Sequence, residues 1–454
     1  MYDIIVIGGG PGGNNVAVQL AKYGKKTAIV ERDAFGGTCL NRGCIPTKTL
    51  LSSSRLIEQL RSSAFGINAE GVEPDYEKLL AHKNSVVETL RAGSEKRLAE
   101  SGVDIYRGEG FVEEPGKVKC SSADGSVTEL NGHSIIIAVG SRPLIPSIPG
   151  TELQGVYTSD SMLETLPRLS RLTIIGGGVI GVEFASIYSG LGAEVTILEA
   201  QPRILSSMDR ELAQSLSLSM KQKNISIITG AAVERIEQGD GLSCTYGTME
   251  GSASVSSDAV LLAIGRSVNT ENLFAASCVP LLDHGHVVID ERHQSSIPGI
   301  YAIGDIVAGG IQLAHAASSQ AIALAARLAG VPRSIDTSLV PVCVYSEPEI
   351  ASVGLTQAEA KAKGISIKTV KQAMSGSAMT LATGRDRGYI RLISGEDDKL
   401  LGAQLFCGHA TEFIGEIALA IAKGLTAKEL SELVRPHPTF EENITAAAEA
   451  LAAK

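Results

Sequence analysis

The 454-residue sequence predicts an α/β fold with two similar strand–turn–helix units and an α+β domain at its C-terminal end. A glycine-rich turn follows an apolar run twice, near residues 8 and 176. Glycine is abundant at 49 residues and tryptophan is absent, which suits tightly turned α/β units more than a β-sandwich. After about residue 336 the chain changes to β-like runs followed by helices.

The first unit begins with a strand at residues 3–7, which shows no alternation of polar and apolar side chains, as in a buried parallel strand. A glycine frame, a helix from Val16 to Tyr23 and a second strand over 26–30 follow, and Glu31 ends that strand. The frame consists of Gly8, Gly10 and Gly13. The first glycine makes the turn, the second lets the backbone approach a pyrophosphate, and the third lets the helix pack on the strand. The unit therefore predicts a Rossmann-like dinucleotide site with Glu31 at the ribose hydroxyls.

The second unit repeats this pattern, with strands at 172–175 and 194–198 and with Glu199 at the end. Its glycine frame is Gly176, Gly178 and Gly181. The last glycine of each frame precedes the acid by the same 18 residues. Two dinucleotide units in one chain predict two nucleotides and electron transfer between cofactors.

Residues 36–48 carry two cysteines, Cys39 and Cys44, five positions apart and flanked by glycines. They can be bridged only across a distorted first helical turn, because the Cα atoms of a disulfide lie within about 7 Å. We interpret them as a redox-active disulfide; a stapled loop and half of a zinc site are the alternatives. No second ligand pair at short spacing follows, so no metal site is predicted. An FAD anchored at the first frame could place its flavin against this pair, and the second frame would then hold a nicotinamide nucleotide.

The choice of nicotinamide nucleotide rests on Glu199, which can accept the 2′-hydroxyl of NAD and repels a 2′-phosphate. Arg203 lies nearby and would favour NADP, but a single Arg after a Glu is more often a solvated surface charge. We therefore expect NAD.

Two further strands end in similar glycine turns, at Gly140 after residues 134–139 and at Gly265 after 259–264, and each is expected to close its own unit. A third turn, Gly304-Asp305, places an acid where it can bond the ribityl chain or pyrophosphate region of the flavin nucleotide. The remaining predicted features are a long amphipathic helix over 74–101 and a proline-rich linker over 143–149.

The C-terminal segment shows β-like runs at 339–345, 389–393 and 399–405 and then two helices. It also carries His437 between two prolines, with Glu442 five residues later. Glu442 can hold the imidazole in one tautomer, and His437 can serve as the base that thiol–disulfide exchange requires. The fold or a second subunit must bring it to Cys39.

The formal charge of −10 argues against nucleic acid or an anionic membrane surface as a partner. No apolar run reaches the roughly 18 residues of a membrane span, and residues 1–7 show no signal-peptide pattern. We therefore expect a cytoplasmic protein, in which one close cysteine pair is more often catalytic than structural.

Together these motifs resemble the class I pyridine nucleotide–disulfide oxidoreductases along essentially the whole chain and in the family's order. The resemblance rests on residues 36–48, both glycine frames, residues 301–305 and residues 437–442. It implies a homodimer with an FAD-binding domain over 1–145, an NAD-binding domain over 146–270, a central domain over 271–335 and an interface domain over 336–454.

Within this family the sequence is most similar to the dihydrolipoyl dehydrogenases. This similarity rests on the residues of the cysteine motif, on residues 341–355 and on Glu199. That similarity implies oxidation of protein-bound dihydrolipoyl groups with NAD through FAD, and lipoylated carriers of 2-oxoacid dehydrogenase or glycine cleavage complexes as partners. One alternative is a glutathione-reductase-like enzyme that reduces a small disulfide with NAD(P)H. The other is a flavoprotein without catalytic activity.

The resemblance also implies residue roles. Cys39 would exchange with the lipoyl dithiol and Cys44 would face the flavin, while His437 would serve the partner subunit's disulfide. Lys48 would lie at the N5 edge of the flavin, paired with Glu183. The sequence differs from the usual residues of the family at four places: Arg435, Val139, Asn14 and Gln320-Ala321. We expect these differences to adjust the packing or the redox potential of the flavin and not to change the enzyme class.

Overall fold

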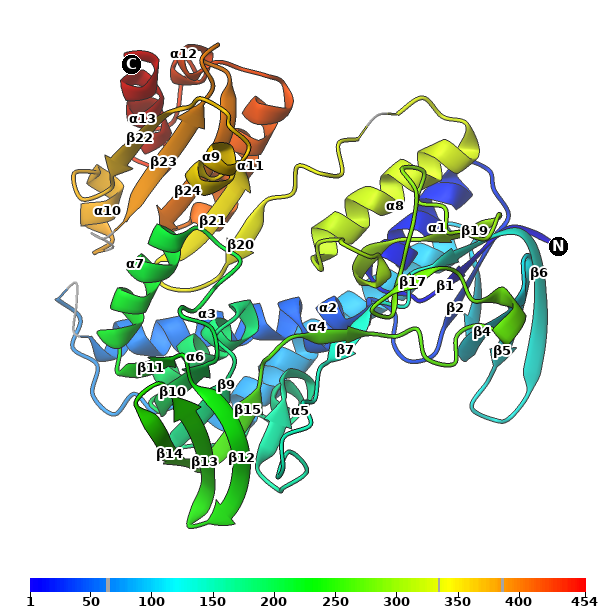
Figure 1. Ribbon diagram of the computed structural model, residues 1–454, viewed down its shortest axis with the longest axis horizontal. Helices are drawn as coiled ribbons and strands as arrows, with labels where there is room; N and C mark the ends of the chain where they lie inside the picture. The colour runs from blue at the N-terminus through cyan, green and yellow to red at the C-terminus, as the bar shows by residue number, and fades with distance from the viewer. Residues whose placement is uncertain (63–65, 334, 385–387) are drawn as a thin grey trace.

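The computed structural model describes residues 1–62, 66–333, 335–384 and 388–454. Figure 1 shows two α/β lobes joined by the long helices α3 (Cys44–Arg61) and α4 (Tyr76–Glu100), and a C-terminal lobe above the second of them. The fold is therefore the predicted one, two nucleotide-binding α/β units and a C-terminal α+β unit.

The first lobe is built on a sheet with strand order β3-β2-β1-β6-β5-β4, with β19 also paired to β6. Residues 134–137 of β6 run parallel to β1, whereas residues 127–131 pair antiparallel with β5. The strands are β1 (Tyr2–Ile7), β2 (Thr27–Glu31), β3 (Asp104–Arg107), β4 (Glu109–Glu114), β5 (Lys117–Ser121), β6 (Val127–Ile137) and β19 (Ile300–Ala302).

Helices α1 (Pro11–Lys22) and α8 (Ala314–Ala329) pack against each other, and α1 also contacts β1 and β2 (Figure 1). The helix α1 begins five residues before the predicted Val16, because Pro11 has the backbone angle of a first helical position and needs no N–H donor there. This early start places the helix N-terminus directly at the glycine frame.

The second lobe contains a parallel sheet with strand order β11-β10-β9-β15-β8. Its strands are β8 (Val156–Thr158), β9 (Arg171–Ile175), β10 (Glu194–Glu199), β11 (Ile225–Thr229) and β15 (Ala259–Leu262). Its helices are α5 (Ser159–Thr165), α6 (Val179–Leu191) and α7 (Arg210–Lys221). An antiparallel sheet of β12 (Ala232–Gly239), β13 (Gly241–Thr248) and β14 (Gly251–Ser257) is inserted before β15.

The two connections between the α/β lobes run side by side, because β7 (Ser141–Pro143) pairs antiparallel with β16 (Arg266–Val268). The turns at Gly140 and Gly265 lead directly into these strands. Short elements complete the lobes: α2 (Gly37–Arg42), η2 (Ala276–Cys278), β17 (Leu282–Asp283), β18 (His286–Val287) and η3 (Gly304–Ile306).

The C-terminal lobe has an antiparallel sheet with strand order β20-β21-β24-β23-β22. Its elements are β20 (Val342–Val344), β21 (Glu349–Gly354), α9 (Gln357–Ala362), β22 (Lys368–Ala373), α10 (Ala378–Ala382), β23 (Tyr389–Ser394), β24 (Leu400–Cys407), α11 (Ala410–Ala422), α12 (Ala427–Ser431) and α13 (Asn443–Ala452). The prediction of two helices after the last strand was wrong, because the short α12 lacks a helical repeat long enough to be recognised. β21 and β22 were missed because β21 mixes small and polar residues and β22 is a polar edge strand.

One hydrophobic core joins the second and C-terminal lobes. Leu50 and Leu51 of α3 and Tyr188 of α6 pack in the same buried cluster as Val344 and Ile350 of β20 and β21. The start of the C-terminal sheet is therefore held rigidly beside α3 and α6.

Within the described ranges, none of the helices combines the length and apolar character needed to cross a membrane. The same residues contain no group of three His, Cys, Asp or Glu side chains that could hold a metal ion.

Candidate active site

Both glycine frames form the same turn. Gly8 and Gly176 have φ angles of +102° and +109°, which side chains rarely adopt. A Cβ at Gly13 would lie 1.8 Å from the Gly8 carbonyl oxygen, and one at Gly181 would lie 2.0 Å from that of Gly176. Only glycine allows the helix to approach the strand this closely, so the N-termini of α1 and α6 both point their free N–H groups at the turn.

The acids at the strand ends also occupy equivalent positions. The N–H of Gly9 donates to Glu31 Oε2 at 2.5 Å, and the N–H of Gly177 donates to Glu199 Oε2 at 2.6 Å. A second backbone N–H, two residues after each acid, donates to the other carboxylate oxygen. Each carboxylate is therefore fixed beside its glycine turn, with lone pairs left for ribose hydroxyls.

A cavity of about 2470 Å³ runs between the lobes and is lined by both glycine turns and both acids. Pockets for single drug-sized ligands measure roughly 300–1,000 Å³, so this cavity has room for two dinucleotides. The predicted site residues that line it are Gly8, Gly10, Glu31, Cys39, Cys44, Lys48, Gly140, Gly176, Gly178, Glu183, Glu199, Gly265, Gly304 and Asp305. Gly13 and Gly181 lie behind it, at the helix–strand contacts.

The cysteine stretch lies against the first glycine turn. A Cβ at Gly37 would be 2.6 Å from the Cα of Gly10, so the two backbones touch. The helical path breaks at Gly43 between α2 and α3, where a Cβ would be 2.9 Å from the Thr38 carbonyl oxygen. This break allows Cys39 and Cys44 to meet, as the sequence predicted for a distorted helical turn.

The two sulfur atoms are chemically different. Both residues are free thiols in the structure, and the Cys39 thiol donates a hydrogen bond to Cys44. That bond, together with the nearby Lys48 ammonium, lowers the pKa of Cys44 to about 7 against the opposing effect of burial. The same bond and burial raise the pKa of Cys39. Cys44, the first residue of α3, is therefore the more stable thiolate of the pair.

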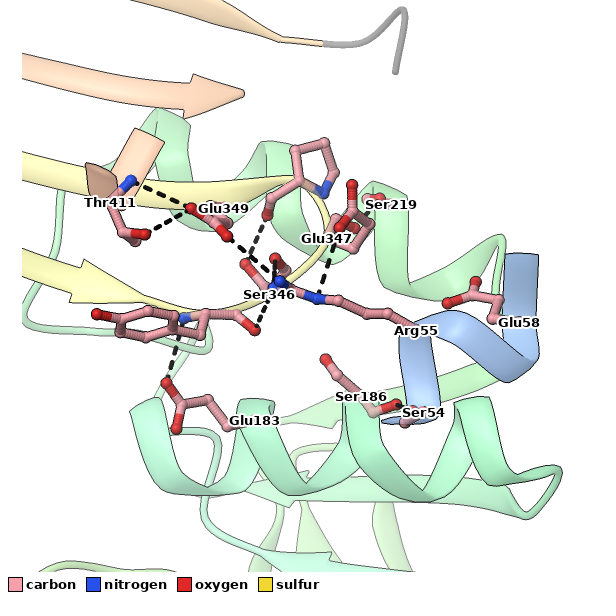
Figure 2. A network of polar contacts seen from close by, with 12 residues as sticks. Ser54, Arg55, Glu58, Glu183, Ser186, Ser219, Ser346, Glu347, Glu349 and Thr411 are labelled. Carbon is pink, nitrogen blue, oxygen red and sulfur yellow. Dashed lines mark hydrogen bonds and ion pairs between the residues drawn. The ribbon is translucent and has the colours of Figure 1, made fainter. Parts of the chain in front are cut away.

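Lys48 pairs with Glu183 across the α3–α6 contact, with Nζ at 2.8 and 3.0 Å from the two carboxylate oxygens. Glu183 is almost fully buried and also accepts the N–H of Tyr345 at 3.2 Å. Figure 2 shows Glu183 on α6 below the β20–β21 turn, and Arg55 of α3 reaching that turn from the side. Tyr345 and Arg55 were not predicted as site residues, because only the folded chain brings them next to Lys48.

Asp305 belongs to a polar cluster at the inter-lobe connections. Ser141 Oγ donates to Asp305 Oδ2 at 2.5 Å, and Arg266 Nε donates to Ser141 Oγ at 2.7 Å. Ser141 and Arg266 directly follow Gly140 and Gly265, so the repeated turn was the sequence signal that could have found them. The N–H of Gly304 donates to Gln320 Oε1 at 2.7 Å. Gln320, which differs from the usual residue of the family, therefore holds the turn that carries Asp305.

Arg203 is not the solvated surface charge that the sequence predicted. Its guanidinium turns inward and donates to the carbonyl oxygens of Ser206 and Met208 at 2.6 and 3.1 Å. These bonds fix the loop after β10 and hold the guanidinium of Arg203 against it.

His437 and Glu442 form the predicted pair, with 2.7 Å between Nδ1 and Oε2. Because a carboxylate only accepts, Nδ1 carries the proton and Nε2 is left free to act as a base. The His437 side chain is 73% exposed on the C-terminal lobe. Among the described residues that line the cavity, neither member of this pair is present, so one chain alone does not bring His437 to Cys39.

Arg435, two residues before His437, is buried and holds its loop. It forms an ion pair with Glu416 of α11 and donates to Thr445 Oγ1 of α13 at 2.7 Å. Arg435, which differs from the usual residue of the family, therefore connects α11 to α13 in the C-terminal lobe.

Comparison with known proteins agrees with this geometry. The pyridine nucleotide-disulphide oxidoreductase family profile matches residues 2–321, and the dimerisation domain of that family matches residues 340–448. The chain is 36% identical to the dihydrolipoyl dehydrogenase of Bacillus subtilis, over 98% of this chain and 97% of the relative. It is 37% identical to that of Chlamydia muridarum, over 97% and 95%.

Solved structures share the whole fold. LpdA from Mycobacterium tuberculosis superimposes with a TM-score of 0.92 at 25% identity, covering 99% of this chain and 100% of that one. The HOCl-induced flavoprotein disulfide reductase RclA from Escherichia coli gives 0.87 at 29% identity, with 99% of both chains covered.

Proposed function

This chain belongs to the pyridine nucleotide–disulphide oxidoreductase family, and we propose that it is a dihydrolipoyl dehydrogenase that oxidises protein-bound dihydrolipoyl groups with NAD⁺. One observation carries the proposal: the pair Cys39 and Cys44 lines the same cavity as two glycine turns, each with its own carboxylate, Glu31 or Glu199. That arrangement connects a dithiol to two nucleotides, as the reaction requires.

The enzyme uses FAD and NAD. The first turn, which touches the cysteine stretch, would hold FAD through Gly8, Gly10, Glu31 and the Asp305 cluster. The second turn would hold NAD through Gly176, Gly178 and Glu199. When bound there, FAD would supply an acceptor for the two electrons of the dithiol and a hydride donor for NAD⁺.

The exchange step uses the difference between the two sulfurs. One thiol of the dihydrolipoyl group attacks Cys39 of the Cys39–Cys44 disulfide, and the Cys44 thiolate leaves. The second lipoyl thiol then attacks the lipoyl sulfur of the mixed disulfide and releases Cys39. The products are the lipoyl disulfide and the reduced pair, and His437 takes the proton of the attacking thiol.

The base comes from a second subunit. The chain contains the dimerisation domain of the family, and His437 lies on that domain, outside the cavity of its own chain. A homodimer would place His437 of the partner subunit at Cys39. The partners beyond the dimer would be lipoylated carriers of 2-oxoacid dehydrogenase or glycine cleavage complexes.

The test is reduction of NAD⁺ by dihydrolipoamide with the FAD-loaded protein. We expect turnover with NAD⁺ and much slower turnover with NADP⁺. The Cys44→Ser variant should lose this activity while NADH still reduces an artificial electron acceptor through FAD. Unchanged dihydrolipoamide oxidation in that variant would contradict the scheme.

A second function is favoured by the likeness to the disulfide reductase RclA: reduction of a small disulfide by NADH or NADPH. Rates with NADPH and glutathione disulfide decide between the two. We expect these rates to be negligible beside those with lipoamide and NADH, because the Glu199 carboxylate, fixed beside the second glycine turn, repels a 2′-phosphate.

A further inference from the structure

The ring of Tyr345 lies directly against the Lys48 ammonium. Lys48 Nζ is 4.4 Å from the ring centroid, while the Glu183 carboxylate is within hydrogen-bond distance of the same nitrogen. The ammonium is thus held between a carboxylate and the negative face of an aromatic ring. Lys48, Glu183 and Tyr345 all line the cavity that contains Cys44.

The backbone of Tyr345 is fixed from two sides. Its N–H donates to Glu183 of α6 at 3.2 Å, and its carbonyl oxygen accepts from Arg55 Nη2 of α3 at 3.0 Å. Arg55 also donates to the Ser346 carbonyl at 2.9 Å (Figure 2). The helices that carry Lys48 and Glu183 therefore also set the place of the ring.

Arg55 is itself held in position by acids of the same turn. Its guanidinium lies 3.3 Å from Glu349 and 3.6 Å from Glu347 (Figure 2). Glu349 is buried and accepts the N–H and hydroxyl of Thr411 at 3.1 and 2.7 Å. This network makes the position of Tyr345 a property of the folded lobes rather than of a mobile loop.

Cys44 depends on where the Lys48 ammonium lies. The groups that act on its charge are Cys39 of α2, Lys48 of its own helix and Glu183 of α6, and Lys48 is the cation among them. The Lys48 side chain is 31% exposed and has a flexible four-carbon stem. Without the Tyr345 ring against it, the Lys48 ammonium can move away from Cys44 and into the cavity.

We propose that Tyr345 is a positioning residue, whose ring keeps the Lys48 ammonium against Glu183 and beside the Cys44 thiolate. The aromatic face does this, and the hydroxyl is not required. The inference deepens the proposed function, because it concerns the redox pair of that reaction, but its test does not depend on any substrate.

The test measures alkylation of Cys44 by iodoacetamide in the holoenzyme as a function of pH. A Cys39→Ser background leaves Cys44 as the remaining thiol of the pair, and mass spectrometry of its peptide separates it from other cysteines. Tyr345→Leu should move the alkylation midpoint up by about one pH unit, because the cation–π contact is lost and the Lys48 ammonium is no longer held beside the Cys44 thiolate. Tyr345→Phe should leave the midpoint of the background variant unchanged.

Two further variants keep the result interpretable. Arg55→Gln, which releases the Tyr345 carbonyl, should shift the midpoint in the same direction by a smaller amount, even if Tyr345→Leu folds poorly. Tyr2→Leu removes a similar lysine–tyrosine contact, with Lys26 at 5.1 Å, outside the cavity, and should not shift it.

An unchanged midpoint in both Tyr345→Leu and Arg55→Gln overturns the proposal, as does an equal shift in Tyr345→Phe. Absence of dihydrolipoamide turnover in the parent protein would instead contradict the proposed function, and it leaves the alkylation result valid.

Discussion

Glu31 and Glu199 show how a single carboxylate can be fixed for recognition. Each accepts one backbone N–H on each oxygen, so neither can rotate away from its glycine turn. Neutral–charged hydrogen bonds of this kind contribute roughly 1.5–3 kcal/mol each. The carboxylate therefore presents its remaining lone pairs in one direction, as discrimination between a hydroxyl and a phosphate requires.

The nucleotide preference tests this arrangement. We expect Glu199→Ala to lower kcat/KM for NADH about tenfold, because one charge-assisted bond to ribose is lost. The variant should not gain activity with NADPH, since Arg203 remains bonded to the carbonyls of Ser206 and Met208. Steady-state rates with both nucleotides measure this.

Glu194, an exposed acid at the start of the same strand, provides the control. Glu194→Ala should leave both rates unchanged. Efficient use of NADPH by Glu199→Ala would show that Arg203 is free to turn outward.

The motif residues were predictable because their chemistry is local in sequence. The glycine frames, the acids 18 residues beyond them and the Cys39–Cys44 spacing all follow from short stretches of chain. Arg203 was misjudged because its partners, two backbone carbonyls, carry no sequence signal. The roles assigned to individual site residues stay predictions until variants are measured.

The contact between α3 and α6 sets the geometry of the redox site. Ser54 of α3 donates to the carbonyl oxygens of Ser186 and Ile187 at 3.2 and 3.0 Å. Opposite it, a Cβ on Gly190 would lie 2.1 Å from Ser54 Oγ and 3.1 Å from the Ser54 carbonyl oxygen. The absence of a side chain at Gly190 lets the helices approach, and the same two helices carry Lys48 and Glu183.

Gly190→Ala should therefore force the helices apart and lower the free energy of unfolding by about 1–3 kcal/mol, as overpacking does in a close-packed core. We expect a reduced melting temperature by circular dichroism and slower dihydrolipoamide oxidation. Adding Ser54→Ala should recover part of the loss, because the nearest clashing atom is removed.

Gly93 of α4 is the matched control, since it is an exposed helical glycine with open space around its Cβ position. Gly93→Ala should raise the stability by up to about 1 kcal/mol through helix propensity. If Gly93→Ala lowered the stability as much as Gly190→Ala, the close approach of α3 and α6 would not explain the effect at Gly190.

An ion-pair network joins the second and C-terminal lobes at α7, which Figure 1 shows directly beneath the C-terminal sheet. Arg391 of β23 has a side chain only 7% exposed, lies 3.6 Å from Asp209 and pairs with Glu211. Lys371 of β22 pairs with Glu211 as well. These contacts hold the C-terminal lobe at a fixed angle to the cavity.

Removing the guanidinium of Arg391 should strongly destabilise the fold. We expect Arg391→Ala to lower the free energy of unfolding by about 3 kcal/mol, because its buried pair with Asp209 is broken and that carboxylate is left without its cation. Urea denaturation followed by tyrosine fluorescence measures this change in the free energy of unfolding. Arg235→Ala, which breaks an exposed pair with Glu237, should change stability by less than about 0.5 kcal/mol.

The same network predicts a pH dependence. Burial tends to raise the pKa of Glu211, but its bonds to Lys371 and Arg391 outweigh that effect and lower it. A lowered pKa means that the stabilisation is complete above the unfolded value of about 4.3 and is lost as the pH falls through the folded value. The stability difference between the parent and Glu211→Gln should therefore be largest at neutral pH and should shrink in acid. A difference that stays constant down to acid pH would exclude this role.

The arrangement of the lobes was only partly predictable. The order of the units follows from the motifs, whereas the division at residues 145, 270 and 335 stays a prediction. Contacts such as Arg55 with Tyr345 and Ser141 with Asp305 join residues 290 and 164 positions apart. No local pattern marks such pairs, because packing of the lobes creates them.

The central claim is that the cysteine pair of one subunit works with His437 of the partner subunit to oxidise dihydrolipoyl groups. The most direct measurement co-expresses Cys44→Ser and His437→Gln chains and assays purified mixed dimers for NAD⁺ reduction by dihydrolipoamide. Each variant alone should be nearly inactive. A mixed dimer should regain about half of the parent activity, because one of its sites combines an intact cysteine pair with an intact His437. Mixed dimers as inactive as the single variants would contradict the account.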